Sequence, residues 1–515
     1  VEALAHHYSL APTGAAEKAV DYSLLAAEKA VSVHAHERAL DHYSNALEAL
    51  EDLDDPVRKA VVLELLGDTH LTTFFVAEAI RAYEDALHVL ELAGATGEQA
   101  YYRLHAKLGR VMAREKMDPA QARAYLNSAL ERIPEDSPDR VKCLAALAQC
   151  MVQEQDLAQA HQQAEFALEL ARKLEQPGAV ASASEALCRV YLAQGDMEAL
   201  FSTTQRRIVA SEVDDDLYGL FLAYRLNVVR NWFAGTYREG EQWALDGLRI
   251  SAELNALGWE ATLMAGYTSI LTQEGRWSEV LAFEQRLLPL FNRTGSTGCF
   301  CWMFLSLAEV ESRLGNDDQA RKHISDSEDI WFQLLGPENR RIFQWRFFGH
   351  LFLEEWELAW DQVERSRKKF GHEPSVTDSG RFLWTISVPQ VAARMGRWSE
   401  AASLAEQAHE LCQRPRLPLG LAMAHFALGL AHAGQRQWEQ SLREYEAAVA
   451  LFQELGHLWD MANAQTEMGL VLSARRQPGD LQAAKHLLMQ ALAGFERLDA
   501  KPGVSKVNTA LEQIA

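Results

Sequence analysis

Long apolar runs are absent from this sequence. No stretch approaches the roughly 20 consecutive apolar residues that a membrane-spanning helix needs, and the first residues do not form a signal peptide with a basic start and an apolar middle. We therefore expect a cytoplasmic protein that makes no contact with a membrane.

Cysteine is scarce, because the 515 residues contain only six, scattered along the chain. Cys299 and Cys301 lie close together, but no second pair completes the spacing of a zinc site. Isolated cysteines in a cytoplasmic protein are reduced and behave as small buried hydrophobic residues. The sequence thus predicts free thiols and no metal site.

Positive charge is also in deficit. The chain has 50 Lys and Arg residues against 72 Asp and Glu residues, which gives a formal net charge of −22. Nucleic-acid-binding proteins instead present clustered Lys and Arg to the phosphate backbone. The sequence therefore predicts no direct role in binding nucleic acid. A hydrophobic content of 48% is that of a folded protein.

Catalytic motifs are missing as well. The sequence contains no phosphate loop of the form Gly-x4-Gly-Lys-Ser/Thr, no HExxH motif, and no evident nucleophile with its base. We predict a protein that is not an enzyme, with no catalytic residues and no cofactor. An unrecognised site in the aromatic middle of the chain is the one enzymatic alternative.

What the sequence does contain is a repeat. Gly275-Arg276-Trp277-Ser278-Glu279 recurs as Gly396-Arg397-Trp398-Ser399-Glu400, about three times 40 residues further on. Glycines also recur at intervals of 40 residues at positions 195, 235, 275 and 315. A fixed period in this range is the signature of a stacked repeat array.

Each repeat is a pair of helices. Apolar residues follow the helical spacing of i, i+3, i+4 and i+7, and no long stretch alternates with period two. In the second helix a small residue such as Ala39 is followed by a bulky one, Tyr43, and by another small one, Ala46. This pattern begins at residues 39, 79, 122, 160, 200, 240, 280, 320, 359, 401, 441 and 484. Small residues on one stripe let paired helices approach closely.

These observations predict an all-α solenoid of about twelve helical hairpins, preceded by a partial hairpin and closed by an end-capping helix at Val504–Ile514. All thirteen tryptophans lie between Trp232 and Trp459. We therefore divide one continuous array into a Trp-free N-terminal part (1–231), an aromatic-rich part (232–499) and a capping helix (500–515). Aromatics three residues before the small one, such as Tyr237, Trp277 and Trp398, are interpreted as packing residues.

The hairpins at Leu71–Leu90, Leu419–Leu455 and Asp460–Leu498 resemble tetratricopeptide (TPR) repeats in a longer form of about 40 residues, against about 34 for the standard repeat. This resemblance covers nearly the whole chain. It implies a right-handed superhelix with first helices lining its concave face, where a peptide, a partner protein or an inducer binds.

The opening residues carry a second resemblance. Leu4-Ala5-His6-His7-Tyr8, Ala16-Glu17-Lys18-Ala19-Val20 and Glu37-Arg38-Ala39-Leu40-Asp41-His42-Tyr43 resemble the junction between the ATPase core and the repeats of large bacterial signalling ATPases. That class, the STAND ATPases, includes LuxR-type activators and cyclase-associated ATPases. The resemblance implies a sensor arm for signal transduction. Since the chain starts at Val1 and not at Met, we expect a segment whose ATPase domain lies upstream.

Six residues fall at groove-facing positions of first helices and are the candidate binding residues. They are Arg225, Trp302, Arg313, Arg341, Gln344 and Arg394. Several arginines in an acidic chain would suit an acidic peptide, a carboxylate or a phosphate, and a tryptophan beside them would give an anchor. Alternatively, each arginine pairs with a glutamate of a neighbouring repeat.

Together these features predict a non-catalytic recognition module that binds a peptide, a protein or a small anionic ligand on its concave face. We expect it to be the sensing region of a bacterial signal-transduction ATPase or transcriptional regulator. The alternative is a free-standing adaptor that scaffolds a protein complex.

Overall fold

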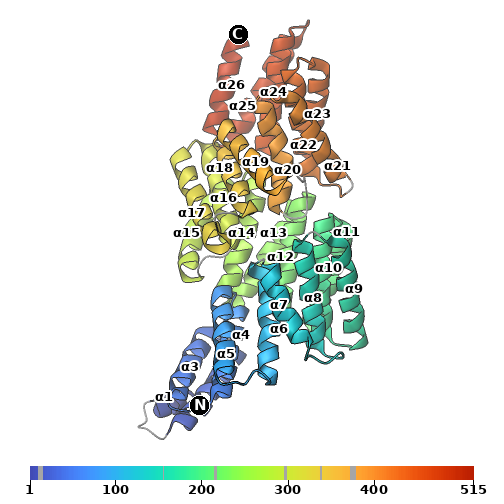
Figure 1. Ribbon diagram of the computed structural model, residues 1–515. Helices are drawn as coiled ribbons and strands as arrows, with labels where there is room; N and C mark the ends of the chain where they lie inside the picture. Colours follow the sequence, from blue (N-terminus) through green and yellow to red (C-terminus); the bar gives the residue numbers. More distant parts are fainter. Residues whose placement is uncertain are drawn as a thin grey trace.

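The computed structural model describes residues 1–9, 15–116, 118–154, 156–213, 217–294, 298–336, 339–371, 379–413 and 415–514. The regular structure of these residues is entirely helical, and successive helices pair as hairpins that stack into an elongated array (Figure 1). The fold is that of a TPR-like solenoid. The prediction of an all-α repeat protein is confirmed.

Twelve hairpins stand in the described ranges, each made of an even-numbered first helix and an odd-numbered second helix. The first helices are α2 (Ala16–Ser32), α4 (Pro56–Thr72), α6 (Gln99–Val111), α8 (Pro138–Gln153), α10 (Pro177–Gln194), α12 (Leu217–Ala234), α14 (Leu257–Gln273), α16 (Gly298–Leu314), α18 (Arg340–Phe352), α20 (Ser379–Arg394), α22 (Pro418–Gly434) and α24 (Leu458–Arg475). The second helices are α3 (His36–Leu50), α5 (Val76–Leu92), α7 (Pro119–Leu130), α9 (Leu157–Lys173), α11 (Met197–Val213), α13 (Tyr237–Glu253), α15 (Trp277–Thr294), α17 (Asp317–Leu335), α19 (Trp356–Phe370), α21 (Trp398–Gln413), α23 (Trp438–Leu455) and α25 (Asp480–Arg497).

Two helices flank the hairpins, α1 (Glu2–Ser9) and α26 (Lys501–Ile514), and one π-helical turn, η1 (Met112–Lys116), extends α6. The final helix begins at Lys501, three residues before the predicted start. The predicted boundary between residues 231 and 232 falls inside α12. The rise in tryptophan content there is therefore a change of composition within one array.

Within a hairpin, small residues of one helix face bulky residues of the other. A Cβ atom on Gly67 of α4 would lie 2.5 Å from Cε1 of Tyr83 in α5. One on Gly429 of α22 would lie 2.6 Å from the ring of Tyr445 in α23. Ala79 and Ala86, which flank Tyr83 on the same stripe, are fully buried. The small–bulky–small pattern of the sequence is thus the interface between paired helices.

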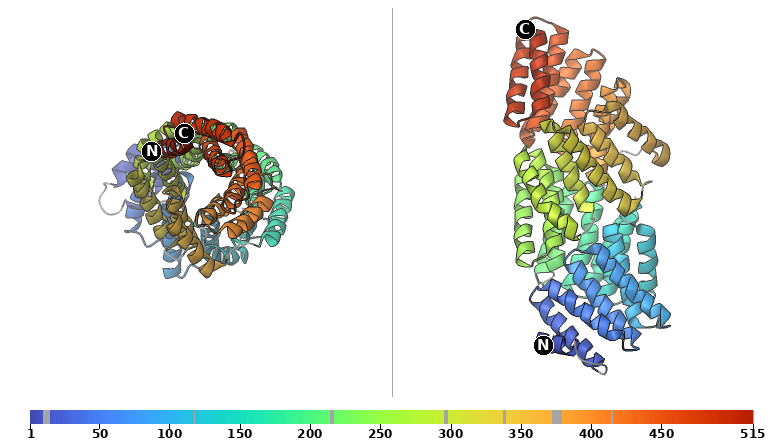
Figure 2. Two further views of the ribbon diagram at one scale, coloured as in Figure 1. Left: turned by 90° about the horizontal axis from the view of Figure 1, so that it is seen from above. Right: turned by 90° about the vertical axis from the view of Figure 1, so that its left-hand side faces the viewer.

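The hairpins wind into a superhelix with an open centre, seen along its axis in the left view of Figure 2. Contacts recur between segments five hairpins apart: α12 packs against α22, and α16 packs against α26. Gly258 of α14 lies just as close to the turn after α4, because an added Cβ would stand 2.4 Å from the carbonyl oxygen of Thr73. One superhelical turn therefore takes about five hairpins, and successive turns touch.

Glycines at the ends of first helices lie at this contact between turns. Gly235 and Gly275 adopt φ angles of 72° and 74°, a left-handed conformation that glycine reaches without steric cost. A Cβ on Gly235 would lie 2.3 Å from a methyl group of Leu455, and one on Gly275 would lie 2.6 Å from a methyl group of Leu498. The glycines that revealed the period thus end helices and also leave room for the next turn.

Aromatic and polar side chains join the turns. The Tyr237 hydroxyl and Nε2 of His457 are 2.8 Å apart, and the ring centroids of Trp277 and Trp459 are 5.9 Å apart. Tyr237 and Trp277 are buried, as predicted for packing residues, whereas Trp398 at the same repeat position is 41% exposed. The difference arises because Tyr237 and Trp277 meet side chains of the following turn.

Five of the six cysteines, Cys143, Cys150, Cys188, Cys301 and Cys412, are buried free thiols. The side chain of Cys299 lies outside the described residues. None of the helices in the described ranges combines the length and the apolar character that crossing a membrane requires.

Candidate functional site

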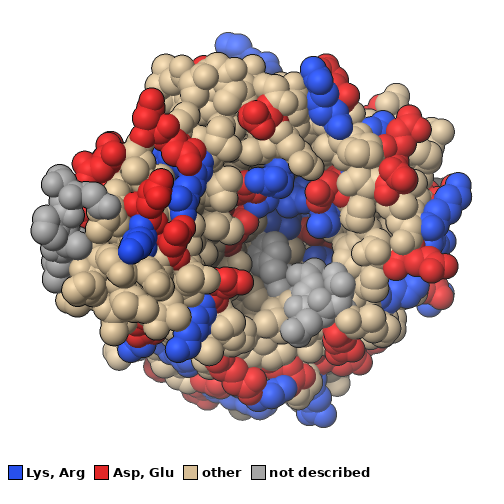
Figure 3. All heavy atoms as spheres, turned by 90° about the horizontal axis from the view of Figure 1, so that it is seen from below, with Lys and Arg blue, Asp and Glu red and all other residues tan. Residues whose placement is uncertain are grey.

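The centre of the superhelix is hollow. Viewed from the N-terminal end, the hollow has both basic and acidic side chains around it (Figure 3). Further along the axis, in the aromatic-rich part, a cavity of about 310 Å³ lies among the inner helices. Its wall comes mainly from first helices, namely α12, α14, α16, α18, α20, α22 and α24. First helices therefore form the concave face, as the sequence analysis expected.

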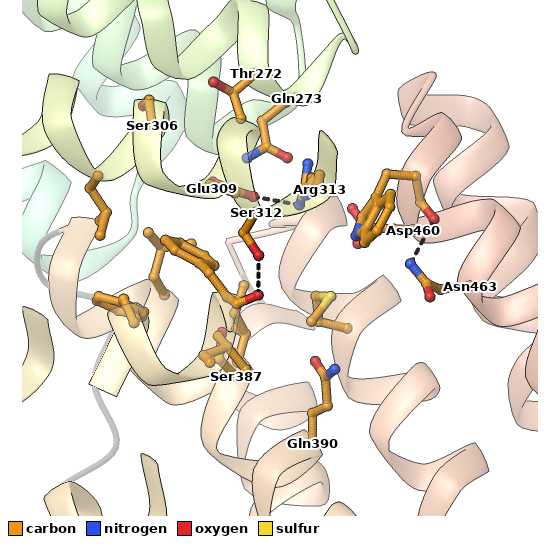
Figure 4. A pocket seen from close by; sticks show the side chains of 18 of the residues that line it. Thr272, Gln273, Ser306, Glu309, Ser312, Arg313, Ser387, Gln390, Asp460 and Asn463 are labelled. Carbon is orange, nitrogen blue, oxygen red and sulfur yellow. Dashed lines mark hydrogen bonds and ion pairs between the residues drawn. The ribbon is translucent and has the colours of Figure 1, made fainter. Parts of the chain in front are cut away.

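Uncharged polar side chains occupy much of this wall. Gln273 of α14 and Gln390 of α20 lie half-buried on different sides of the cavity (Figure 4). Ser306 of α16 and Ser387 of α20 stand between them and are nearly buried. Amide and hydroxyl groups both donate and accept hydrogen bonds. The wall therefore offers partners for neutral polar groups such as peptide units.

Two other polar side chains of the wall are engaged by the protein itself. Nδ2 of Asn463 donates to the carbonyl oxygen of Trp459 at 3.0 Å, and the Ser312 hydroxyl donates to the carbonyl oxygen of Phe352. These bonds fix the side chains in place. The Ser312 bond also satisfies the carbonyl group of Phe352, the last residue of α18, where intrahelical donors run out.

Tryptophans supply the apolar part of the cavity. Trp302 packs edge-to-face on Trp345, with ring centroids 4.9 Å apart, and Trp345 in turn packs on Trp331 at 5.1 Å. Trp232 also lines the cavity, and its buried Nε1 has no hydrogen-bond partner in the described part of the chain. A buried donor without a partner costs about 1–3 kcal/mol. An acceptor that entered here would relieve that cost.

Charged residues sit where the cavity meets the contact between turns. Arg313 forms an ion pair with Glu309 one helical turn away. Its guanidinium carbon lies 5.7 Å from the ring of Trp277 and 5.1 Å from that of Trp459, which belong to successive turns. Cation–π contact with both rings stabilises the arginine between them.

The carboxylates around Arg313 have shifted pKa values. Burial raises the pKa of Glu309, although the positive charge of Arg313 partly offsets it. Burial also opposes ionisation of Asp460, yet the hydrogen bond from His457 and the charge of Arg313 lower its pKa. Asp460 is thus ionised at neutral pH, while Glu309 becomes protonated at a higher pH than an ordinary glutamate.

A second group of ion pairs includes Arg394, which lines another side of the cavity. Nη2 of Arg394 donates to Oε1 of Glu467 at 2.7 Å, and Nζ of Lys506 lies 3.0 Å from the same oxygen. Burial opposes ionisation of Glu467, but the two cations bring its pKa to about 2. The guanidinium of Arg394 also lies 5.9 Å from the ring of Trp356.

The structure brings three of the six candidate binding residues together, since Trp302, Arg313 and Arg394 all line the cavity. Both arginines also pair with glutamates, but not with those of an adjacent repeat: Glu309 lies in the same helix as Arg313, and Glu467 lies two hairpins beyond Arg394. Binding by these residues stays a prediction.

The other three candidates lie elsewhere. Arg225 is half-buried on α12 and acts on the buried carboxylate of Glu185. The guanidinium of Arg341 lies 5.2 Å from the ring of Trp331. Gln344 is only 4% exposed within α18.

Some residues that line the cavity were not among the six predicted binding residues, although a pattern in the sequence indicates them. Trp302, Ser306, Glu309 and Arg313 follow one another at helical spacing, so they share one face of α16. Extending that stripe from the candidates Trp302 and Arg313 would have added Ser306 and Glu309 to the predicted binding residues. Asp460 and Asn463 lie on α24, and only the superhelical winding brings them opposite α16.

The described residues include no group of three or more His, Cys, Asp or Glu side chains that could hold a metal ion. The cavity instead combines tryptophan faces, amides, hydroxyls and fixed charges. Such a lining suits binding of a polar chain with bulky side groups.

Comparisons with known proteins give structural matches only. No family model matches the sequence, and no curated protein matches it. Among solved structures, the chain is similar to Cut9 in the crystal structure of the APC/C hetero-tetramer Cut9–Hcn1, with a TM-score of 0.51 and 14% identity over 96% of each chain. It also matches yeast Tom70 with a TM-score of 0.32 and 14% identity, over 89% of this chain and 92% of that one. The likeness to Cut9 identifies the fold.

Proposed function

We propose that this protein is a non-catalytic recognition module that holds an extended segment of a partner protein along its superhelix axis. The observation that carries the proposal is the cavity of about 310 Å³, lined by inner helices of seven successive hairpins. A hollow of this size has no room for a folded domain, but it accepts a few residues of extended chain. Each such residue adds about 3.3 Å of length.

The chemistry of the wall supports a peptide. An extended peptide has unpaired backbone donors and acceptors at every residue, and Gln273 and Gln390 offer complementary groups from two sides. Trp302 provides an aromatic surface of the kind that often carries a large share of binding energy. Cut9, which shares the fold, is present with Hcn1 in a hetero-tetramer, and this supports a protein as the partner.

We further propose that the module is the sensing arm of a bacterial signal-transduction ATPase. The support is the resemblance of residues 1–50 to the junction that follows the ATPase core in such proteins. Binding along the axis would then favour one winding of the superhelix and so act on the ATPase. The phosphate loop that this requires would be encoded upstream of Val1.

Peptide recognition is tested by a peptide-display selection on the full chain, followed by fluorescence-anisotropy titration of the enriched peptides. We compare wild type with Trp302→Ala and Gln390→Ala, and use Arg341→Ala as the matched control because Arg341 does not line the cavity. Loss of an aromatic anchor costs about 2 kcal/mol or more. The Kd should therefore rise roughly 30-fold for Trp302→Ala and remain unchanged for Arg341→Ala.

Enriched peptides that bind Trp302→Ala and Gln390→Ala as tightly as wild type would contradict the axial site. The ATPase context has its own test, namely ATP hydrolysis by the full-length protein with and without a selected peptide. A response abolished by Trp302→Ala supports the sensing arm. A reading frame without a phosphate loop favours the adaptor that scaffolds a protein complex.

A further inference from the structure

Four arginines converge on one glutamate in the part of the array between η1 and α12, apart from the cavity described above. Arg114 lies in η1, Arg189 in α10, Arg207 in α11 and Arg225 in α12. All four act on the carboxylate of Glu185 in α10, and we refer to them as the arginine cluster. In a chain with a net charge of −22, such a concentration of positive charge is not a consequence of composition.

Glu185 is held by several guanidinium groups at once. Nη2 of Arg207 donates to its Oε2 at 3.2 Å, Nη1 of Arg114 lies 3.8 Å from the same oxygen, and Nη2 of Arg189 lies 3.5 Å from Oε1. Burial alone would raise the pKa of Glu185, but the surrounding positive charges bring it to about 2. The carboxylate of Glu185 therefore lies in the field of four guanidinium groups.

Arg207 has donors that this carboxylate does not use. Its side chain is 1% exposed, and both Nε and Nη1 have no hydrogen-bond partner within the described residues. Arginine presents five N–H donors in a planar fork, and buried donors without acceptors are costly. A further acceptor anion beside Glu185 would satisfy them.

Two members of the cluster are partly exposed. Arg189 and Arg225 both lie on first helices that pack against each other. The side chain of Arg189 is 25% exposed, and Arg225 is half-buried. These two members could therefore guide an anion toward the buried Arg207.

We propose that the arginine cluster binds a phosphoryl group, carried either by a phosphorylated side chain of a partner or by a phosphorylated small molecule. A phosphoryl group brings up to two negative charges and three acceptor oxygens, which suits several convergent guanidinium groups. The Nε and Nη1 donors of Arg207, which have no partner among the residues that the structure describes, suit the several acceptor oxygens of this group. The site is independent of the segment proposed for the other cavity.

The first test is calorimetric titration of the full chain with inorganic phosphate, at constant ionic strength maintained with sodium chloride. We compare wild type with the variant Arg225→Gln, which removes a half-buried member of the arginine cluster. Arg249→Gln is the control, because Arg249 is an exposed arginine of α13 that pairs with Glu253. Loss of one hydrogen bond to a charged group weakens binding about ten- to hundredfold. We expect saturable binding to wild type and Arg249→Gln, and at least tenfold weaker binding to Arg225→Gln.

The substitution Glu185→Gln should change the affinity for phosphate in the opposite direction. Removing the competing carboxylate should tighten phosphate binding several-fold and make the thermal midpoint rise more steeply with phosphate than with chloride. A cluster that only stabilises the fold would lose stability in Glu185→Gln and show no preference for phosphate. Absence of saturable binding to wild type, or equal binding to Arg225→Gln, overturns the proposal.

Two competition arms identify the source of the phosphoryl group. One uses a phosphoserine peptide library beside the same library without phosphate, and the other uses glucose 6-phosphate. Phosphate-dependent peptide binding assigns the group to a partner protein, and displacement of phosphate by the sugar phosphate alone assigns it to a small molecule. Trp302→Ala should leave phosphate binding intact, so failure of the axial peptide site and failure of this site give different results.

Discussion

Several acidic side chains in the interior remain charged because arginine or lysine stands beside them. Glu467 is nearly buried, and burial would normally raise its pKa. Arg394 and Lys506 reverse that effect, and the pKa lies near 2 against an ordinary value of 4.5. These three residues join the C-terminal end of α20 to the middle of α24 and to α26. The charge state of Glu467 is thus linked to the stability of the last hairpins.

This linkage predicts an acid-dependent loss of stability. Because the folded pKa is depressed, the contribution of Glu467 is present above about pH 4.5 and is lost as the pH falls toward 2. A shift of this size corresponds to roughly 3 kcal/mol. Glu467→Gln should lower the free energy of unfolding at pH 7 by about 3 kcal/mol and flatten its decline between pH 4.5 and 2.

Hydrogen exchange of the amides in α24 and α26, with urea unfolding, checks this prediction. The control is Glu253→Gln, because Glu253 pairs with Arg249 on an exposed face and such pairs contribute only about 0–1 kcal/mol. If both variants show the same pH profile as wild type, the charge of Glu467 does not stabilise these helices.

At the scale of helices, each first helix makes different contacts on its different faces. One stripe of small residues packs on its own second helix, and another face lines the hollow. In α14, the N-terminal end also meets the preceding superhelical turn, where Gly258 approaches Thr73 and Phe74. This division of faces explains why α14 is apolar on almost every side and yet belongs to a wall with polar groups.

Two glycines of α14 allow the contact between turns to be tested within one helix. A Cβ on Gly258 would lie 2.4 Å from the backbone oxygen of Thr73, whereas the nearest atom to a Cβ on Gly266 is 3.4 Å away. Alanine has a higher helix propensity than glycine by about 1 kcal/mol. Gly266→Ala should therefore raise the free energy of unfolding by up to about 1 kcal/mol.

Gly258→Ala should instead lower the free energy of unfolding, since overpacking costs about 1–3 kcal/mol and the backbone of the adjoining turn has to move. Urea denaturation of both variants beside wild type gives the sign. A stabilising effect of both substitutions would mean that the two turns are not in close contact at this point.

At the scale of the whole molecule, the array is a closely wound superhelix. Trp459 contributes to this winding because its ring contacts Trp277 of the previous turn and Phe495 of its own. Arg313 adds a cation–π contact to the same ring. A ligand on the axis and the contacts between turns therefore share residues. Under the proposed function, binding would therefore be coupled to the winding through Arg313 and Trp459.

Removing this contact should loosen the superhelix. Trp459→Ala should increase the radius of gyration in small-angle X-ray scattering and lower the free energy of unfolding by about 3 kcal/mol. Trp398→Ala is the matched control, since Trp398 is 41% exposed and loses only about 1 kcal/mol of packing. An unchanged radius of gyration for Trp459→Ala would show that other contacts fix the winding.

The sequence by itself determined the hairpins, because their packing is local. The 40-residue glycine period, the small–bulky–small stripe around residues such as Tyr83, and helical periodicity all act between neighbours in the chain. The resemblance to TPR repeats implied that first helices line the concave face, and three of the six residues predicted there, Trp302, Arg313 and Arg394, line the cavity. These inferences succeed because repeat packing follows from nearest-neighbour contacts.

Only the tertiary structure decided which turns touch. The offset of five hairpins follows from small rotations summed over many repeats, and no local pattern encodes that sum. For this reason Trp277 is covered by Trp459 while Trp398 at the same repeat position stays exposed. Arg225 instead acts on Glu185 of the adjacent hairpin and lies apart from the cavity that Arg313 and Arg394 line. The predicted binding residues are therefore divided between a cavity that includes contacts between superhelical turns and a cluster within neighbouring hairpins.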